Sequence, residues 1–314
     1  TNGVVEDKPH LLLEPSSTKR ILFSEDFTQW EQLSGTTVEY VADLLNPDGS
    51  LGGYKVSGSG IFVNDGSGMS GAATSTSGRS IYARSVSGTG NVQLLSHNSN
   101  TNNVFTVNET WQRFELNSTP SIFGQSNFYV DLRGASSTLS EVYVFAAQSE
   151  SIDIVTSYIK TAGTTITRAA ETCNNSKPSV NSTEGVLYAE ILALANDSTN
   201  RYITLSDGTN NNRIILRFST ANRLMVNILV GNSNQFTAQL DVSPNQFYKA
   251  AFSYKQNQFK FYIDGVLIGS ATSGSVPSAG TFDILNFENA TAGTEKFYGK
   301  VKGLAVYNEA LSES

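Results

Sequence analysis

Aromatic and aliphatic residues alternate with polar ones over residues 259 to 269, FKFYIDGVLIG, and only Asp264 and Gly265 interrupt the alternation. A period of two indicates an extended strand with one apolar face. An Asp-Gly pair supplies the positive φ angles that a tight hairpin turn requires. The pattern therefore predicts a β-hairpin. Its apolar face is formed by Phe259, Phe261, Ile263, Val266 and Ile268. Further on, Leu304 and Val306 alternate in FYGKVKGLAVYNEALS, which predicts a closing strand over the same core.

Similar short apolar runs recur along the chain, separated by Gly, Ser and Asn. A first set lies between residues 20 and 156, and a second begins at residue 185. The segment between them, 157–184, is rich in Thr, Ser and Asn and breaks the pattern, so it is expected to be a linker. Residues 1–19 are expected to be an arm or linker, because Pro9 and Pro15 oppose regular structure. The fold class predicted is all-β, with two antiparallel β-sandwich (jelly-roll) domains in tandem, over 20–156 and 185–314.

Composition agrees with this fold and limits the possible partners. The 314 residues are 39% hydrophobic and 16% charged, and no run shows a sustained helical period. The net charge of -7 would repel a phosphate backbone, so nucleic acid is not an expected partner. No apolar run is long enough to cross a bilayer, so no membrane insertion is expected. Cys173 is the single cysteine and is interpreted as an incidental loop residue rather than a reactive thiol.

Residue groups that would indicate catalysis are not evident in the sequence. His10 and His97 lie in polar segments without a neighbouring partner, so neither is a credible general base. Two acids could still meet in space, such as Glu25 with Asp26 or Glu184 with Glu190, and glycoside hydrolysis needs only two. We expect a protein without enzymatic activity, cofactor or metal.

Candidate ligand-binding residues lie on a loop and beside it. A sugar site needs an aromatic face flanked by amide, carboxylate or guanidinium groups. The stretch LSDGTNNNRI, 205 to 214, places several such groups between two strands, although a polar hairpin loop has the same composition. Its candidate residues are Asp207, Asn210, Asn211, Asn212 and Arg213. Tyr202 could add a stacking ring, or it could be a packed strand residue.

The two tryptophans are each a candidate for core packing or for ligand contact. Trp111 begins WQRFELN, where it shares one strand face with Arg113 and Glu115, and it is the candidate for ligand contact. Trp30 is expected to close one end of the first sandwich.

Three segments resemble parts of bacteriophage tail, fibre and other structural proteins. They are LLLEPSSTKRILFSEDFTQW (11–30), VYVFAAQSE (142–150) and SYIKTAGTTITRAAETCNN (157–175). The region around RSIYARSV and TWQRFELN also resembles a jelly-roll carbohydrate-binding module. Such modules often hold a calcium ion through an acid on the last strand, but EVYVFAAQ has no aspartate there, so no calcium site is carried over.

The hairpin at 259 to 269 and the closing strand resemble a laminin-G or concanavalin A-like sandwich, a likeness that extends over 185–314. Together these resemblances imply a non-enzymatic virion component, a fibre or decoration protein located in the extracellular particle. Its implied partners are polysaccharide or cell-surface glycan and other virion proteins, with a homo-oligomer, a trimer by expectation, as its assembly. The alternative is a pair of carbohydrate-binding modules from a larger polysaccharide-degrading enzyme.

Overall fold

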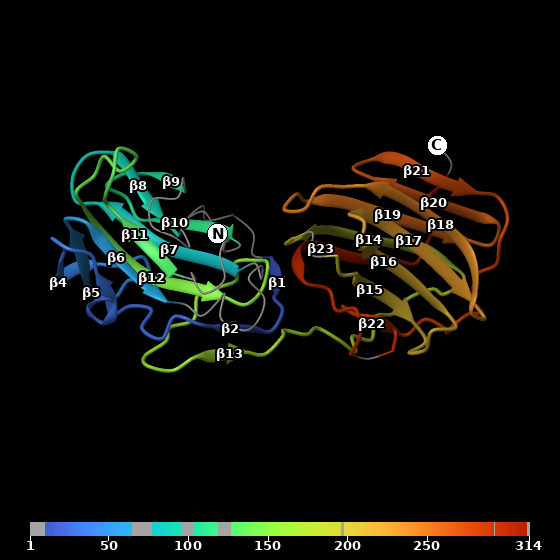
Figure 1. Ribbon diagram of the computed structural model, residues 1–314. Coiled ribbons are helices and arrows are strands. Elements are labelled where there is room, and N and C mark those ends of the chain that lie inside the picture. The colour runs from blue at the N-terminus through green and yellow to red at the C-terminus, as the bar shows by residue number, and fades with distance from the viewer. Residues whose placement is uncertain are drawn as a thin grey trace. The chain divides into compact units, whose positions relative to one another are not determined.

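A computed structural model describes residues 10–64, 77–95, 103–118, 127–195, 198–291 and 293–312. Apart from one turn of 3-10 helix at Phe27–Gln29, the regular elements in these ranges are β-strands. Their pairings are antiparallel, which confirms the predicted all-β fold class. The described chain divides into two compact units, one of residues Ser16–Ala169 and one of residues 10–15 with 170–312 (Figure 1). Neither unit has a described helix that could span a membrane.

The first unit is a sandwich of a seven-stranded and a five-stranded sheet (Figure 1). The larger sheet contains β10 (Gln112–Ser118), β7 (Ser77–Ser85), β12 (Glu141–Glu150), β2 (Ser17–Lys19) and β13 (Ile166–Arg168), with β5 (Leu51–Ser57) and β4 (Thr37–Leu45) attached through β12. The smaller sheet contains β3 (Glu31–Gln32), β6 (Gly60–Asn64), β11 (Asn127–Asp131), β8 (Gly90–Leu94) and β9 (Val104–Val107).

The core of the first unit follows from the alternation along these strands. Ile81 and Val144 of the larger sheet and Val92 of the smaller sheet are fully buried in one cluster. Trp30 belongs to this cluster with 3% of its surface exposed, and its Nε1 donates to the carbonyl of Phe23 at 3.0 Å. Trp30 is therefore a core residue of the first sandwich.

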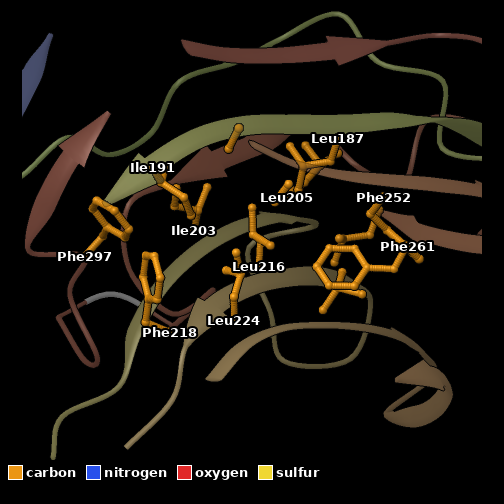
Figure 2. Close-up of a cluster of buried hydrophobic side chains, with 14 of the residues drawn as sticks. Leu187, Ile191, Ile203, Leu205, Leu216, Phe218, Leu224, Phe252, Phe261 and Phe297 are labelled. Atoms are coloured by element: carbon orange, nitrogen blue, oxygen red, sulfur yellow. The ribbon is translucent and has the colours of Figure 1, made fainter. Parts of the chain in front are cut away.

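The second unit is also a two-sheet sandwich. Its six-stranded sheet runs β1 (Leu11–Leu13), β23 (Gly299–Tyr307), β14 (Glu184–Ala193), β19 (Tyr248–Lys255), β20 (Gln258–Ile263) and β21 (Val266–Ala271). Its five-stranded sheet runs β18 (Ser233–Asp241), β17 (Arg223–Val230), β16 (Arg213–Phe218), β15 (Arg201–Ser206) and β22 (Ile284–Asn286). Figure 2 shows Leu187, Phe252 and Phe261 facing Leu205 and Leu216 across the interior.

The predicted hairpin is present as β20 and β21. Asp264 and Gly265 form its turn with φ angles of 49° and 83°, the left-handed values for which this dipeptide is suited. The three apolar residues of β20, namely Phe259, Phe261 and Ile263, are all buried in the core. Leu304 and Val306 of β23 pack against the same core, as predicted. Val266 differs from the expectation, because it is 62% exposed on the edge strand.

The structure differs from the sequence-based expectation at the amino-terminal segment. Residues 1–9 lie outside the described residues, but Leu11–Leu13 is not an arm. It pairs with β23 as an edge strand of the second unit, and Leu13 is 3% exposed in that unit's core. Ser17–Lys19 is likewise a strand, β2, of the first unit. Pro15 lies between the two strands, where its missing N–H removes no ladder bond.

The expected linker over 157–184 is also partly regular structure. Ile166–Arg168 forms β13 and pairs with β2, so the first unit continues to Ala169. At its other end, Glu184 already belongs to β14. Strands of three residues are too short to show a period, and their hydrogen-bonding partners lie far away in sequence. The sequence pattern could not have revealed them.

Candidate functional site

The polar loop between β15 and β16 is held together by its own side chains. Asp207 Oδ1 accepts hydrogen bonds from the backbone N–H of Thr209 at 2.8 Å and from its hydroxyl at 2.7 Å. Asp207 Oδ2 accepts a bond from Asn212 Nδ2 at 2.8 Å. Burial by itself would raise the pKa of Asp207, but these donors outweigh it and hold the pKa below its ordinary value. Asp207 thus serves as the internal acceptor of the loop.

The three consecutive asparagines of this loop have different environments. Asn212 Oδ1 accepts from the backbone N–H of Gly231 at 2.9 Å, which ties the loop to the turn between β17 and β18. Asn210 Oδ1 accepts from Arg213 Nη1 at 2.6 Å. Asn211 is exposed, and its backbone carbonyl accepts from the N–H of Asn232 at 2.8 Å. Of the three side chains, that of Asn211 is the one directed to solvent.

Tyr202 is packed on the side of β15 that faces away from the core. Only 5% of its surface is exposed. Arg217 Nη1 donates to its hydroxyl at 2.6 Å, and the Arg217 guanidinium carbon lies 5.2 Å from the ring centroid. Burial raises the pKa of Tyr202, the charge of Arg217 opposes this, and Glu295 adds to the rise. Because Arg217 covers its ring, Tyr202 supports the arginine and offers little open surface for stacking a sugar.

Arg213 joins Tyr202 through a chain of polar side chains. Arg213 Nη1 donates to Asn289 Oδ1, and Asn289 Nδ2 donates to Glu295 Oε2 at 3.2 Å. Glu295 in turn interacts with the Tyr202 hydroxyl and raises its pKa. We call the group Tyr202, Arg213, Arg217, Asn289 and Glu295 the outer-face cluster. The structure therefore brings together three of the predicted site residues, Tyr202, Arg213 and Asn210. Asp207 and Asn212 instead bind each other and hold the loop in place.

Three members of the outer-face cluster were not singled out from the sequence. Arg217 could have been found, since the alternation of RIILRF places it on the same face as Arg213, opposite the buried Ile214 and Leu216. Asn289 and Glu295 carry no such signal. They come from the segment between β22 and β23, which the fold brings to β15 through the bond from the Tyr202 N–H to the Glu295 carbonyl at 3.2 Å.

Trp111 lies in the first unit, immediately before β10. It is half-buried, and its Nε1 donates to the carbonyl of Leu45 at 2.8 Å. The Arg84 guanidinium carbon lies 5.5 Å from the Trp111 ring centroid and 4.8 Å from that of Tyr143. Phe114 of β10 packs against the core, so it lies on the strand face opposite to the one that Trp111 shares with Arg113 and Glu115.

The strand register extends this arrangement across the sheet. Tyr143 lies opposite Arg84 on one side and opposite Lys55 on the other, and Lys55 lies opposite Glu39. Lys55 Nζ and Glu39 Oε2 form an ion pair at 2.7 Å. Since Gln112 pairs with Ala83, Trp111 continues the same line. We call Trp111, Arg84, Tyr143, Lys55 and Glu39 the aromatic row. It lies on the face opposite the core residues Ala83, Val142 and Val144.

The aromatic row has the chemistry that saccharide recognition requires. Arg84 lies over both rings, but Trp111 and Tyr143 are half-buried, unlike the buried Tyr202, and their exposed surface can pack against C–H groups. The ammonium and carboxylate groups beside them can bind hydroxyls. A second line of side chains, Arg113, Tyr82 and Phe145, adjoins it, with the Arg113 guanidinium carbon 6.0 Å from the Tyr82 ring centroid. Trp111 is the predicted site residue that belongs to this surface.

The carboxylates considered for hydrolysis either make other contacts or lie far apart. Glu25 binds Tyr158 and Lys160 at 2.8 and 2.5 Å, while Asp26 accepts from Thr28 at the start of the 3-10 turn. Glu184 and Glu190 stand six residues apart on β14, a span of about 20 Å, whereas paired glycosidase acids lie roughly 5–10 Å apart.

Other features of the described residues do not form a metal or ligand centre. No group of three or more His, Cys, Asp or Glu side chains that could hold a metal ion occurs among the residues described. Cys173 is half-buried and packs against the core of the second unit. A hollow of about 520 Å³ lies beside the ion pair of Glu184 and Lys255, which are 3.1 Å apart, and is lined by Thr183, Val276 and Ser278 among others.

The sequence of the second unit is similar to one known family. Residues 188–314 match the family Laminin_G_3, described as the concanavalin A-like lectin/glucanases superfamily. A comparison with curated protein sequences finds no match.

Several solved structures resemble parts of the chain. The carbohydrate-binding module CBM40 of the Ruminococcus gnavus IT-sialidase, bound to α2,3-sialyllactose, is 15% identical over 41% of this chain and 78% of its own, with a TM-score of 0.36. The heptameric SAP-like pentraxin of Limulus polyphemus is 15% identical over 44% and 70%, with a TM-score of 0.36. Domains LG4-5 of the mouse laminin α1 chain are 9% identical over 82% and 90%, with a TM-score of 0.32. Likeness at this level identifies no ligand.

Proposed function

We propose that this protein is a non-enzymatic, glycan-binding structural component of a bacteriophage virion, a fibre or decoration protein of the extracellular particle. The observation that carries the glycan-binding part is the aromatic row of the first unit. There, Trp111 and Tyr143 flank the guanidinium of Arg84 on a sheet face away from the core. Rings with charged neighbours bind sugar C–H faces and hydroxyls together, which suits a polysaccharide chain lying across the strands.

The virion part of the proposal is supported by how the three phage-like segments meet in the fold. The N–H of Arg20 donates to the carbonyl of Ser149 at 2.9 Å, and the N–H of Gly163 donates to that of Leu22 at 2.7 Å. β2 pairs with both β12 and β13. The greater part of the three segments, residues 16–30, 142–150 and 157–169, therefore forms one connected part of the first unit, as expected if that part is shared with such proteins as a folded element.

Binding to bacterial surface polysaccharide tests the proposal. We expect the full chain to be retained on purified capsular or lipopolysaccharide glycan, and Trp111→Ala and Tyr143→Ala each to lower the affinity about tenfold or more. Tyr307→Ala is the matched control, because Tyr307 is a 57% exposed ring on β23, outside the row. Equal retention of all four proteins, with unchanged melting temperatures, would remove the aromatic row as the binding site.

The alternative function is a pair of carbohydrate-binding modules from a larger polysaccharide-degrading enzyme. This alternative is favoured because each unit has a group of polar and aromatic side chains on a sheet face away from its core, the aromatic row in the first and the outer-face cluster in the second. Such a pair suits two modules that bind one polymer. Mass measurement in solution distinguishes the two functions. A stable homo-oligomer, for which we propose a trimer, supports the virion role, whereas a monomer that binds one soluble polysaccharide tightly supports the modules.

A further inference from the structure

Two arginines of the outer-face cluster lack a carboxylate partner. Arg213 and Arg217 project from β16 on the side away from the core, and each is half-buried. Their hydrogen bonds go to neutral acceptors: the amide oxygens of Asn210 and Asn289 for Arg213, and the Tyr202 hydroxyl and Met225 sulfur for Arg217. The Nε–H group of each is enclosed without an acceptor among the described residues.

Three other arginines of the described chain are paired with carboxylates. Arg133 pairs with Asp131 at 2.9 Å, Arg113 pairs with Glu115 at 2.9 Å, and Arg223 pairs with Asp241 at 2.8 Å. Taking a guanidinium out of water without a counter-charge is unfavourable, so proteins pair such groups. Burial lowers the pKa of Arg213, which reflects the same unfavourable environment. Arg213 and Arg217 therefore form a positively charged surface, and Glu295, the one carboxylate of the outer-face cluster, compensates their two charges only in part.

Hydroxyl-binding groups lie between these two charges. Four residues of strand separate the arginines by about 13 Å along β16. In the series of contacts that connects Arg213 with Arg217, Asn289 and Glu295 are linked at 3.2 Å. The other oxygen of Glu295 accepts from Asn200 at 3.0 Å. A carboxylate at this point repels a purely anionic ligand such as an acidic peptide, but it accepts hydrogen bonds from sugar hydroxyls. A ligand with hydroxyls in the middle and anionic groups toward its ends fits this order.

We infer that the outer-face cluster of the second unit binds an acidic saccharide, with Arg213 and Arg217 holding carboxylates of its sugar residues and Glu295 and Asn289 holding hydroxyls. Arginine is suited to this role because its planar fork donates two parallel bonds to one carboxylate. This inference rests on the proposed glycan-binding function, but it assigns a second surface, on a different unit from the aromatic row, and a chemical class of ligand.

Titration of the full chain with tetragalacturonate tests the inference, with carboxyl-reduced galactotetraose as the neutral probe. We expect binding of the acidic probe that weakens as salt rises, and binding of the neutral probe that is at least about tenfold weaker. Arg213→Gln and Arg217→Gln should each reduce affinity for the acidic probe about tenfold or more, and Arg217→Lys, which keeps the charge without the fork, should reduce it less.

Two further variants separate binding from folding. Arg223→Gln is the matched control, because Arg223 projects from the neighbouring strand of the same sheet but already has Asp241 as its partner, and it should bind as the native chain does. Glu295→Gln keeps an acceptor oxygen for the sugar hydroxyls but removes the one carboxylate of the cluster, so it should strengthen binding of the acidic probe. A variant that merely unfolds cannot show this gain.

The outcomes are distinct for this inference and for the proposed function. Loss of acidic binding in the arginine variants, with gain in Glu295→Gln, supports the inference. Equal binding of the acidic and neutral probes, or no effect of Arg213→Gln and Arg217→Gln, overturns the inference. If Trp111→Ala still lowers retention on the polysaccharide in that case, the proposed function stands. Binding of a tetraglutamate peptide with equal affinity would show an unspecific anion site and overturn the saccharide assignment. If the native chain binds none of these glycans, both the inference and the proposed function are overturned.

Discussion

Lys19 and Glu150 face each other where β2 pairs with β12, with side chains 2% and 0% exposed. Lys19 Nζ donates to Glu150 Oε1 and, at 2.8 Å, to Thr156 Oγ1. The Glu150 carboxylate also accepts from Ser17 Oγ at 2.6 Å, Gln148 Nε2 at 2.7 Å and the Thr156 N–H at 2.8 Å. A buried ion pair with this many donors is fully hydrogen-bonded, and it joins the beginning of the first unit to its last long strand.

Removing one partner of this pair should strongly destabilise the first unit. We expect Lys19→Met and Glu150→Gln each to lower the free energy of unfolding by about 3–5 kcal/mol, because each leaves an unpaired buried charge. Urea unfolding of the full chain measures this loss of unfolding free energy. The double variant Lys19→Met, Glu150→Leu should lose less than the sum of the two single variants. Single losses below about 1 kcal/mol would show that the pair is open to water.

The same pair makes the stability of the first unit depend on pH. Burial alone would raise the pKa of Glu150, but Lys19 and the hydroxyl donors outweigh it and hold the pKa below the ordinary value of 4.5. The unfolded chain therefore takes up this proton at higher pH than the folded chain. The contribution is complete above pH 4.5 and is lost as the pH falls toward the lower native value.

This pH dependence can be measured as a difference between two proteins. The gap in unfolding free energy between the native chain and Glu150→Gln should be constant near neutral pH and should narrow as the pH falls below 4.5. Glu115→Gln serves as the comparison, because Glu115 is 41% exposed and pairs with Arg113 at the surface. A gap for Glu150→Gln that is flat down to the acid transition would contradict the assignment.

Leu13 should stabilise the second unit, although it precedes the whole first unit in sequence. It is 3% exposed in the core of the second sandwich, whereas Leu11 on the same strand is 40% exposed. We expect Leu13→Ala to cost about 2–5 kcal/mol and Leu11→Ala to cost far less. Hydrogen exchange of the full chain should show faster exchange in β14 and β23 for Leu13→Ala. Faster exchange confined to the first unit would refute the pairing of β1.

Asn212 and Asn211 are adjacent but should respond differently to replacement by alanine. The Asn212 side chain bridges Asp207 and the Gly231 N–H at 2.8 and 2.9 Å. Its loss leaves these groups without their partner, so Asn212→Ala should cost about 1–3 kcal/mol by chemical unfolding. Asn211→Ala should stay within about 0.5 kcal/mol of the native chain. A triple alanine replacement at 210, 211 and 212 would therefore lower the melting temperature and could not report on binding alone.

Local sequence was sufficient for the elements whose evidence lies within a few residues. The hairpin of β20 and β21 follows from period-two alternation and one Asp-Gly pair, because side-chain direction and turn conformation are set by neighbouring residues. The outward position of Trp111 also follows from local sequence, as does the placement of Arg213 and Arg217 on one strand face. Each can be obtained by counting along a single strand.

Tertiary structure decided the features that depend on which strands become neighbours. Lys19 and Glu150 are 131 residues apart, and Asn200 and Glu295 are 95 apart, yet each pair is in contact. β1 joins a sheet whose other strands begin at Glu184. Alternation specifies which face of a strand is buried, but it carries no information on strand order, so the partners of a buried charge or of an outward-facing arginine are set only when the sheets assemble.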